Sequence, residues 1–159
     1  MTLWVAPACG QAVAAACQSK VVVEQVLSYL NAFRARPQAC GGRSFAAAGP
    51  LRWEARLEQA ASGHAAELAL GDQLNHLTAN GRTLRERLRA HGYVAFRVGE
   101  NLAAGQESLD EVLQTWISSA KHCENIMQPE FQEVALVCAS GPGKYGRYWV
   151  MNFGHSVHD

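Results

Sequence analysis

The sequence lacks net charge, because 14 lysines and arginines balance 14 aspartates and glutamates over its 159 residues. It therefore has no basic excess of the kind that favours nucleic acid or an anionic membrane surface as a partner. Charged residues make up only 18% of the chain and hydrophobic residues 48%, which excludes a disordered chain and is typical of a globular domain. The length suffices for one domain with a proper core.

One short segment departs from this balance. Four arginines crowd it: Arg82, Arg85, Arg87 and Arg89. We interpret them as the solvated face of a helix in preference to a binding patch.

No two of the five cysteines have C-x-x-C spacing, so the pattern does not favour a structural zinc site or a thioredoxin-type motif. The cysteines are Cys9, Cys17, Cys40, Cys123 and Cys138. Such wide spacing is typical of long-range disulfides and therefore of an oxidising compartment.

The first 16 residues contain no charged side chain, so the basic start of a signal peptide is missing, but they are apolar and rich in small residues. We expect residues 1–16 to be a signal-like or disordered segment and residues 17–159 to form a single domain. Cleavage before Cys17 would remove Cys9 and leave an even number of cysteines. Residues 14–17 also resemble a lipobox without its usual leucine, so a lipid anchor at Cys17 is an alternative to simple export. The segment is too short and too broken by proline and glycine to be a transmembrane helix.

Hydrophobic spacing predicts helices first and a hairpin last, which indicates an α+β fold. Residues 21–36 and the segment around residues 57–68 have apolar stripes at helical spacing, and residues 41–52 read as a loop. The patterns Thr83-x-x-Glu86 and Ser108-x-x-Glu111 are capping boxes that predict two further helices. Residues 134–139 and 145–153, separated by turn residues, predict a β-hairpin, and residues 93–98 another strand.

Three side chains that could carry chemistry stand at junctions between these elements. They are His76, Glu100 and His122, the first and last of which follow predicted helix ends. Functional side chains are often presented at such places by a rigid scaffold. Spacing alone does not bring the three together, because they lie far apart in the sequence.

Several motifs, in order, resemble a bacterial domain of the CAP superfamily, to which cysteine-rich secretory proteins, antigen 5 and plant pathogenesis-related proteins of class 1 belong. The specific ones are Gly-Glu-Asn-Leu at 99–102 and His-Cys-x-Asn-Ile-Met at 122–127, and the likeness runs from about Val22 to Gly154. It implies a three-layer α-β-α sandwich with a central, largely antiparallel sheet.

The resemblance also implies a cleft with two histidines and two acidic residues. His76 and His122 match the histidines and Glu100 the first acid, whereas Ser119 stands where the second acid is usual. Cysteines at the positions of Cys40 and Cys123 recur in such domains and are thought to be paired. Cys17 and Cys138 are the pair left over if Cys9 is removed, and the pairing of these three stays open.

Two imidazoles facing one cavity can take a divalent metal such as zinc, so His76 and His122 are candidate metal ligands. Glu100 would then be a third ligand, a brace on an imidazole or a general base. A serine nucleophile at 118 or 119 beside His122 has no supporting motif.

These residues leave open whether the protein is an enzyme. We expect a secreted or cell-envelope protein, monomeric, that binds an extracellular protein, a cell-wall component or a lipid. The alternative is a zinc-dependent hydrolase or peptidase that uses the same cleft.

Overall fold

A four-stranded sheet forms the centre of the computed structural model, which describes Cys17 and residues 21–157. Its strands, in spatial order, are β3 (Arg52–Trp53), β5 (Glu133–Ser140), β6 (Arg147–Ser156) and β4 (Ala95–Ala104). The pairs β5–β6 and β6–β4 are antiparallel, and only the short β3 runs parallel to its neighbour β5. The sheet is thus largely antiparallel, and the predicted hairpin of residues 134–153 is confirmed as β5 and β6.

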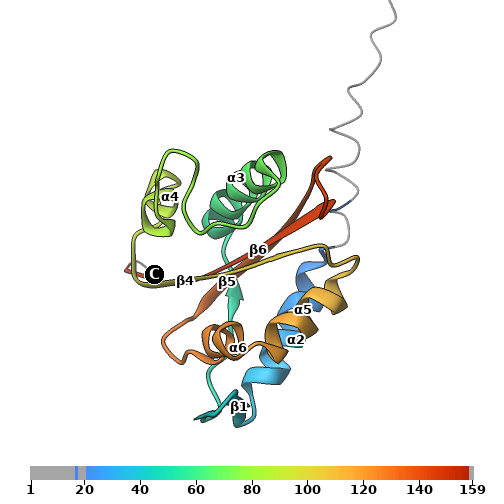
Figure 1. Cartoon of the computed structure of the whole chain (residues 1–159). Coiled ribbons are helices and arrows are strands. Elements are labelled where there is room, and N and C mark those ends of the chain that lie inside the picture. The colour runs from blue at the N-terminus through green and yellow to red at the C-terminus, as the bar shows by residue number, and fades with distance from the viewer. Residues whose placement is uncertain (1–16, 18–20, 158–159) are drawn as a thin grey trace, which may run out of the picture.

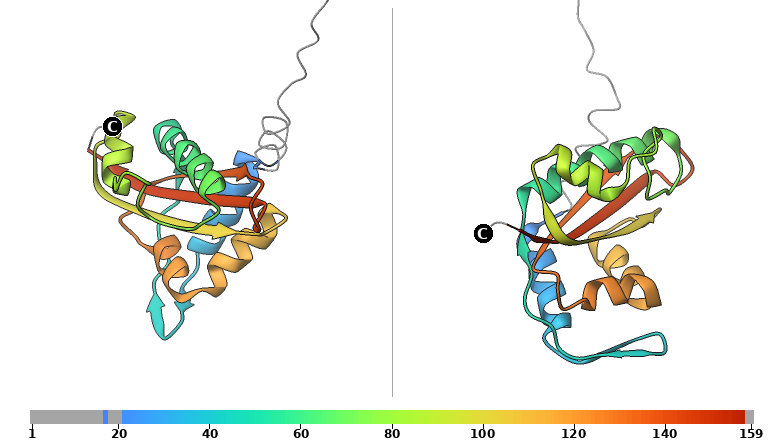
Figure 2. Two further views of the ribbon diagram at one scale, coloured as in Figure 1. Left: turned by 45° about the horizontal axis from the view of Figure 1, so that its top comes forward. Right: turned by 90° about the vertical axis from the view of Figure 1, so that its left-hand side faces the viewer.

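Helices cover both faces of this sheet (Figures 1 and 2). One layer contains α3 (Ala55–Gly71) and α4 (Leu84–Ala90). The opposite layer contains α2 (Val23–Arg34), α5 (Leu109–Ser118) and α6 (Ala120–Met127). The three-layer α-β-α sandwich that the resemblance implied is confirmed.

The alternation of side chains along β5 explains why both faces need a helical layer. Val134 and Leu136 pack into the cluster that contains residues of α2, α5 and α6. Ala135 and Val137 point the other way and pack against residues of α3. Because successive side chains of a strand alternate between faces, an apolar strand of this kind is stable only with cover on both sides.

Two segments differ from the sequence-based prediction. The expected loop at 41–52 contains part of a small hairpin of β1 (Gln38–Cys40) and β2 (Arg43–Phe45), which turns at Gly41 with φ +60°. A side chain at Gly41 would also meet Ala120 of α6, so both the positive φ and the lack of space favour glycine here. The strand expected at 93–98 is longer and places Glu100 inside β4.

The two capping patterns form to different degrees. Thr83 and Glu86 make the complete reciprocal box at the start of α4. Ser108 caps α5, but the Glu111 carboxylate instead accepts from the backbone N–H of Glu107. Both helices begin where the patterns predicted, since either arrangement satisfies N–H groups that the first turn leaves unpaired.

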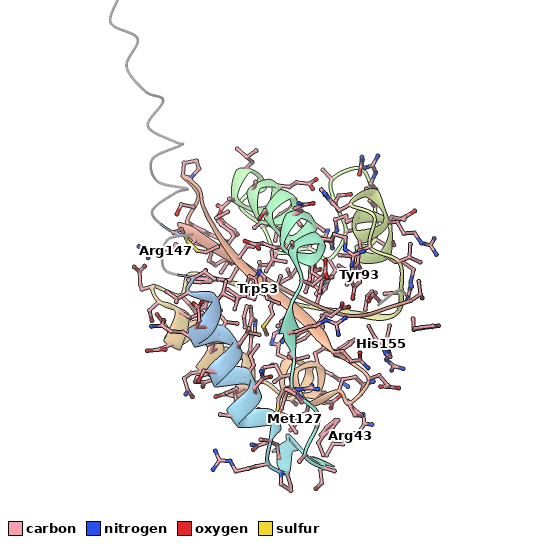
Figure 3. All side chains as sticks on the ribbon, turned by 180° about the vertical axis from the view of Figure 1, so that it is seen from behind. Arg43, Trp53, Tyr93, Met127, Arg147 and His155 are labelled. Atoms are coloured by element: carbon pink, nitrogen blue, oxygen red, sulfur yellow. A yellow bond between two sulfur atoms is a disulfide. The ribbon has the colours of Figure 1, made fainter. Side chains whose placement is uncertain are left out.

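Two disulfides join parts of the chain that are distant in sequence. Cys40 pairs with Cys123, which ties the β1–β2 hairpin to α6, and Cys17 pairs with Cys138 of β5. Met127 of α6 and Arg43 of the hairpin accordingly lie at the same end of the molecule (Figure 3). Both bridges fit the oxidising environment of a secreted protein.

The signal-like segment of residues 1–16 lies outside the described residues. Within Cys17 and residues 21–157, no helix has the length and apolar character needed to cross a membrane.

Arg34, at the end of α2, forms hydrogen bonds to neighbouring segments within the helical layer of α2, α5 and α6. Its guanidinium donates to the carbonyls of Ile126, Gln128 and Phe131, which surround the end of α6, and to that of Gly49. The residue is fully buried, and burial lowers its pKa to about 10, so it stays charged at neutral pH. These bonds replace water for four carbonyl groups at once.

We predict that Arg34→Met destabilises the protein by about 3–5 kcal/mol, because it leaves buried carbonyls without a donor. Arg36→Met, at an exposed position two residues later, is the matched control and is expected to stay within about 0.5 kcal/mol of the wild type. Urea denaturation followed by circular dichroism measures both. Equal stability of the two variants would contradict the role given to Arg34.

Candidate functional site

Glu100 lies at the centre of the candidate site, on the strand at the edge of the sheet. Its side chain points toward α3 and α4 and is only 3% exposed. Arg87 of α4, itself buried, donates to both carboxylate oxygens at 2.9–3.1 Å. This two-pronged contact is the geometry in which arginine pairs best with a carboxylate.

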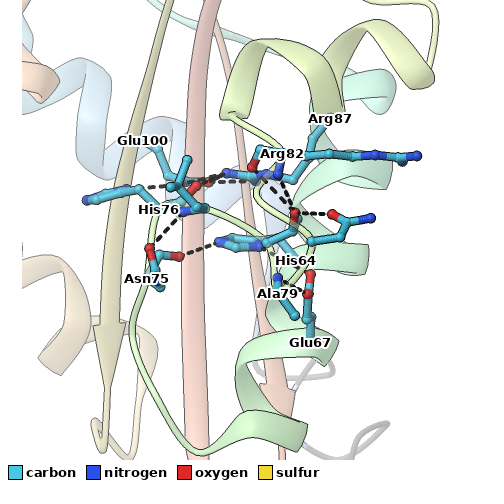
Figure 4. A network of polar contacts seen from close by, with 11 residues as sticks. His64, Glu67, Asn75, His76, Ala79, Arg82, Arg87 and Glu100 are labelled. Atoms are coloured by element: carbon cyan, nitrogen blue, oxygen red, sulfur yellow. Dashed lines mark hydrogen bonds and ion pairs between the residues drawn. The ribbon is translucent and has the colours of Figure 1, made fainter.

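His76 approaches the same carboxylate from the loop between α3 and α4. Its Nδ1 lies 2.8 Å from Oε1 of Glu100, and its side chain is 64% exposed (Figure 4). The backbone of this loop is held as well: Arg87 donates to the carbonyl of His76, and Nε2 of His64 on α3 contacts the carbonyl of Asn75 at 2.8 Å. The imidazole is therefore oriented through Nδ1, while its Nε2 edge is the part left for a ligand.

The pKa of Glu100 reflects two opposing effects. Burial is the larger single one and raises the pKa, but the hydrogen bonds from His76 and Arg87, with the charge of Arg87, together outweigh it. The net result is a pKa below the usual value, so Glu100 is ionised at neutral pH. Because both oxygens are already bonded, the carboxylate acts in this structure as a brace on His76.

His122 lies in α6, on the opposite face of the sheet, and in the described part of the chain its side chain has no hydrogen bond to His76 or Glu100. It follows the end of α5, as the sequence predicted, but it lies in the first turn of a further helix, α6, because Ser119 is both the C-cap of α5 and the N-cap of α6. Asn125 and Asn101 connect this turn to β4: Asn125 donates to the Glu100 carbonyl and Asn101 to that of His122.

The environment of His122 keeps its imidazole neutral. Burial lowers its pKa, and repulsion from His76 acts in the same direction. Its Nδ1 is buried without a hydrogen-bond partner in the described part of the chain. In the same residues, no hydrogen bond joins His122 to Ser118 or Ser119, as a serine nucleophile would need.

The donor set fits a metal only in part. His76 and His122 offer imidazole nitrogens, but Glu100 has no oxygen free of Arg87 or His76. Across Cys17 and residues 21–157, no three His, Cys, Asp or Glu side chains are grouped so that they could hold a metal ion. A zinc ion here would have two protein ligands, where zinc sites usually have three or four.

The family model described as the cysteine-rich secretory protein family, CAP, matches residues 27–153. The chain belongs to this family. The matched range contains His76, Glu100 and His122, so all three sequence-predicted site residues lie inside the CAP domain.

Similar proteins share the fold at low identity. The YkwD protein of Bacillus subtilis is 24% identical over 104 residues, which are 65% of this chain and 39% of that protein. An outer surface protein of Borrelia burgdorferi superposes with a TM-score of 0.70 at 20% identity, over 84% of this chain and 91% of that one. An extracellular SCP-domain protein of Bacillus anthracis gives the same score and identity, over 98% and 45%. This chain thus spans less than half of YkwD and of the anthracis protein.

Sequence reasoning missed two residues that build this CAP site. Arg87 was grouped with the solvated arginines, whereas it is buried and pairs with Glu100; Arg89, two positions on, is exposed as expected. The contact of the buried His64 with the loop of His76 was not foreseen either. The signal for Arg87 was its position three residues after Leu84 and next to Leu88, on the side of α4 that packs inward.

We predict that Arg87→Met costs about 3–5 kcal/mol at pH 7, because it leaves the Glu100 carboxylate buried with only His76 to bond it. Wild-type Glu100 has a lowered pKa, so its contribution is present above the unfolded value near 4.3 and is lost as the pH falls through the folded value. The difference between wild type and variant should therefore shrink below about pH 4.

Chemical denaturation from pH 3 to 8 measures this, with Arg89→Met on the exposed side of the same helix as the control. A stability difference that stays constant over that range would show that the loss comes from packing and not from charge.

Proposed function

We propose that this CAP domain is an extracellular binding module whose ligand contacts the exposed edge of His76, without a metal ion. The observation that supports this most directly is the saturation of Glu100 by Arg87 and His76. A carboxylate with both oxygens engaged by a guanidinium is a poor general base, because protonation would break the ion pair. The Glu100 carboxylate instead fixes the imidazole of His76 in one orientation.

The electrostatics of the cleft favour the same proposal. The charge of Glu100 is neutralised by Arg87, and His122 stays neutral because of burial. A divalent cation would thus approach a cleft with no net negative charge and a guanidinium nearby. A neutral or anionic group of a cell-wall component, lipid or protein meets no such repulsion, and an imidazole can either donate to it or accept from it.

A zinc-dependent hydrolase remains the second candidate, because a histidine whose Nδ1 contacts a carboxylate is also the arrangement that orients metal-bound histidines. His76 and His122 would hold the metal, and zinc would supply an acidified water. The hydrolase would lack a second carboxylate, because Ser119 stands where the second acid is usual in such domains.

Binding to isolated cell-envelope material, with and without EDTA, separates the two candidates. We expect retention of the purified chain to be unchanged by chelator and weakened about five- to tenfold by His76→Ala, the effect of one lost hydrogen bond. Gln73→Ala, an exposed change in the same loop, is the control and should bind like the wild type.

Calorimetric titration with zinc provides the opposing test. Micromolar binding that disappears in both His76→Ala and His122→Ala, together with a chelator-sensitive hydrolysis, would replace our proposal by the metalloenzyme. Retention that is equal in wild type and His76→Ala would remove His76 from ligand contact.

A further inference from the structure

The neutral charge balance of the chain as a whole conceals an uneven distribution. Residues 82–97, which contain α4 and the start of β4, hold five of the 14 lysines and arginines but one of the 14 aspartates and glutamates, Glu86. The rest of the chain is therefore net negative. Positive charge gathered in one segment of an otherwise acidic chain is typical of a surface that meets an anionic partner.

Three of these five arginines keep a charge that no carboxylate neutralises directly. Arg87 is buried against Glu100, and Arg97 forms an ion pair with Glu130. The other three form no ion pair with any residue in the described part of the chain: Arg82, Arg85 and Arg89. The second and third of them share one side of α4, because residues four apart in a helix are neighbours on its surface. With Glu86 as the one acid among them, the segment keeps a net positive charge at its surface.

Two apolar side chains of the same segment point into solvent. Phe96 is 70% exposed and Val94 is 44% exposed. A bulge in β4 between Ala95 and Arg97 leaves Phe96 without a paired residue on β6, and a bulge at a sheet edge re-aims the side chain that it carries. One side of the Phe96 ring has an edge-to-face contact with His155, which supports the ring while most of its surface stays open.

Arg85 joins the positive charge to the exposed ring. Its guanidinium donates to the carbonyl of Ala95 at 2.7 Å and to that of Phe96 at 3.5 Å. Both acceptors are neutral, so the charge of Arg85 persists at the bulge. Figures 1 and 2 show α4 and the start of β4 side by side at one end of the molecule. The sequence alone favoured a solvated helix face for these arginines, and the exposed Phe96 beside them changes that interpretation.

We propose that these five residues form a surface that docks the protein on an anionic lipid bilayer: Arg82, Arg85, Arg89, Val94 and Phe96. The guanidinium groups pair with headgroup phosphates, for which arginine has the matching donor geometry. The ring of Phe96 and the side chain of Val94 enter the apolar boundary just below the headgroups. This docking surface does not rest on the function proposed for His76.

The combination of charge and apolar surface favours a bilayer over a soluble partner. An acidic polymer in solution engages the arginines but offers no apolar phase to Phe96 and Val94. A stable protein interface covers about 800 Å² on each partner, and two exposed apolar side chains are a small part of such an area. A bilayer needs no matching shape, and its interface presents negative charge and apolar chains within a few ångströms of each other.

Co-sedimentation of the full chain with lipid vesicles tests this docking. We expect binding to vesicles of phosphatidylglycerol and phosphatidylcholine in equal parts, and much weaker binding to phosphatidylcholine alone. Binding to the anionic vesicles should fall at about 0.5 M salt, because salt screens exposed charges. Residues 1–16 are apolar as well, so the decisive result is the difference between variants and not the total amount bound.

Two exposed substitutions separate the charged and the apolar part of the surface. Arg89→Gln should weaken binding to the anionic vesicles about fivefold, and Phe96→Ser about tenfold. The matched controls lie outside the surface: Arg36→Gln at an exposed arginine and Leu70→Ser at a leucine that is 83% exposed. Both controls should bind like the wild type. Circular dichroism verifies that each variant is folded.

Three results would overturn the proposal. The first is equal binding of the wild type, Arg89→Gln and Phe96→Ser to anionic vesicles, and the second is equal binding of the wild type to both kinds of vesicle. The third is binding to soluble polyglutamate that Arg89→Gln weakens as much as vesicle binding, with no effect of Phe96→Ser on either, which would indicate an acidic polypeptide as the partner. None of these results bears on His76→Ala in the envelope assay, so the two proposals fail independently.

Discussion

The candidate site depends on the buried ion pair between Arg87 and Glu100. A carboxylate with 3% of its side chain exposed loses nearly all its hydration, and a cost of that kind is offset only by close charged partners with good geometry. The pair also joins two layers, because Arg87 belongs to α4 and Glu100 to β4. Once it is formed, the same guanidinium holds the carbonyl of His76, so the position of the loop follows from the pairing of the charges.

The edge of the sheet explains how the turn that carries His122 is held beside β4. β4 pairs with β6 on one side only, which leaves outward-facing carbonyls that need donors. Trp116 of α5 donates to the carbonyl of Leu102, and Asn125 of α6 to that of Glu100. These side chains fix α5 and α6 against the strand, and the Cys40–Cys123 bridge fixes the turn that carries His122. The same contacts therefore cover the edge of β4 and position the turn that carries His122.

The sequence could predict features whose cause is local. The apolar positions of α2, the complete capping box at Thr83 and the hairpin of β5 and β6 all follow from spacing or turn chemistry within a few residues. The partners of Glu100 could not be predicted in this way, because Arg87 and His76 reach it from 13 and 24 residues away through a fold that brings α4 onto β4. The resemblance to CAP domains named His76, Glu100 and His122. It did not indicate that an arginine would neutralise the acid.

That neutralisation changes what the family's residue pattern means in this chain. Two histidines and an acid, considered as a set, favour a cation site, since the acid would supply negative charge and a ligand oxygen. Here Arg87 neutralises the charge of Glu100, and both carboxylate oxygens are hydrogen-bonded to Arg87 or His76. The lowered pKa of His122 keeps that imidazole uncharged at neutral pH. The three site residues are left with two imidazoles and little net charge. This is the basis of the binding function that we propose: what pairs with the carboxylate, and not the family pattern alone, decides which partner the two histidines suit.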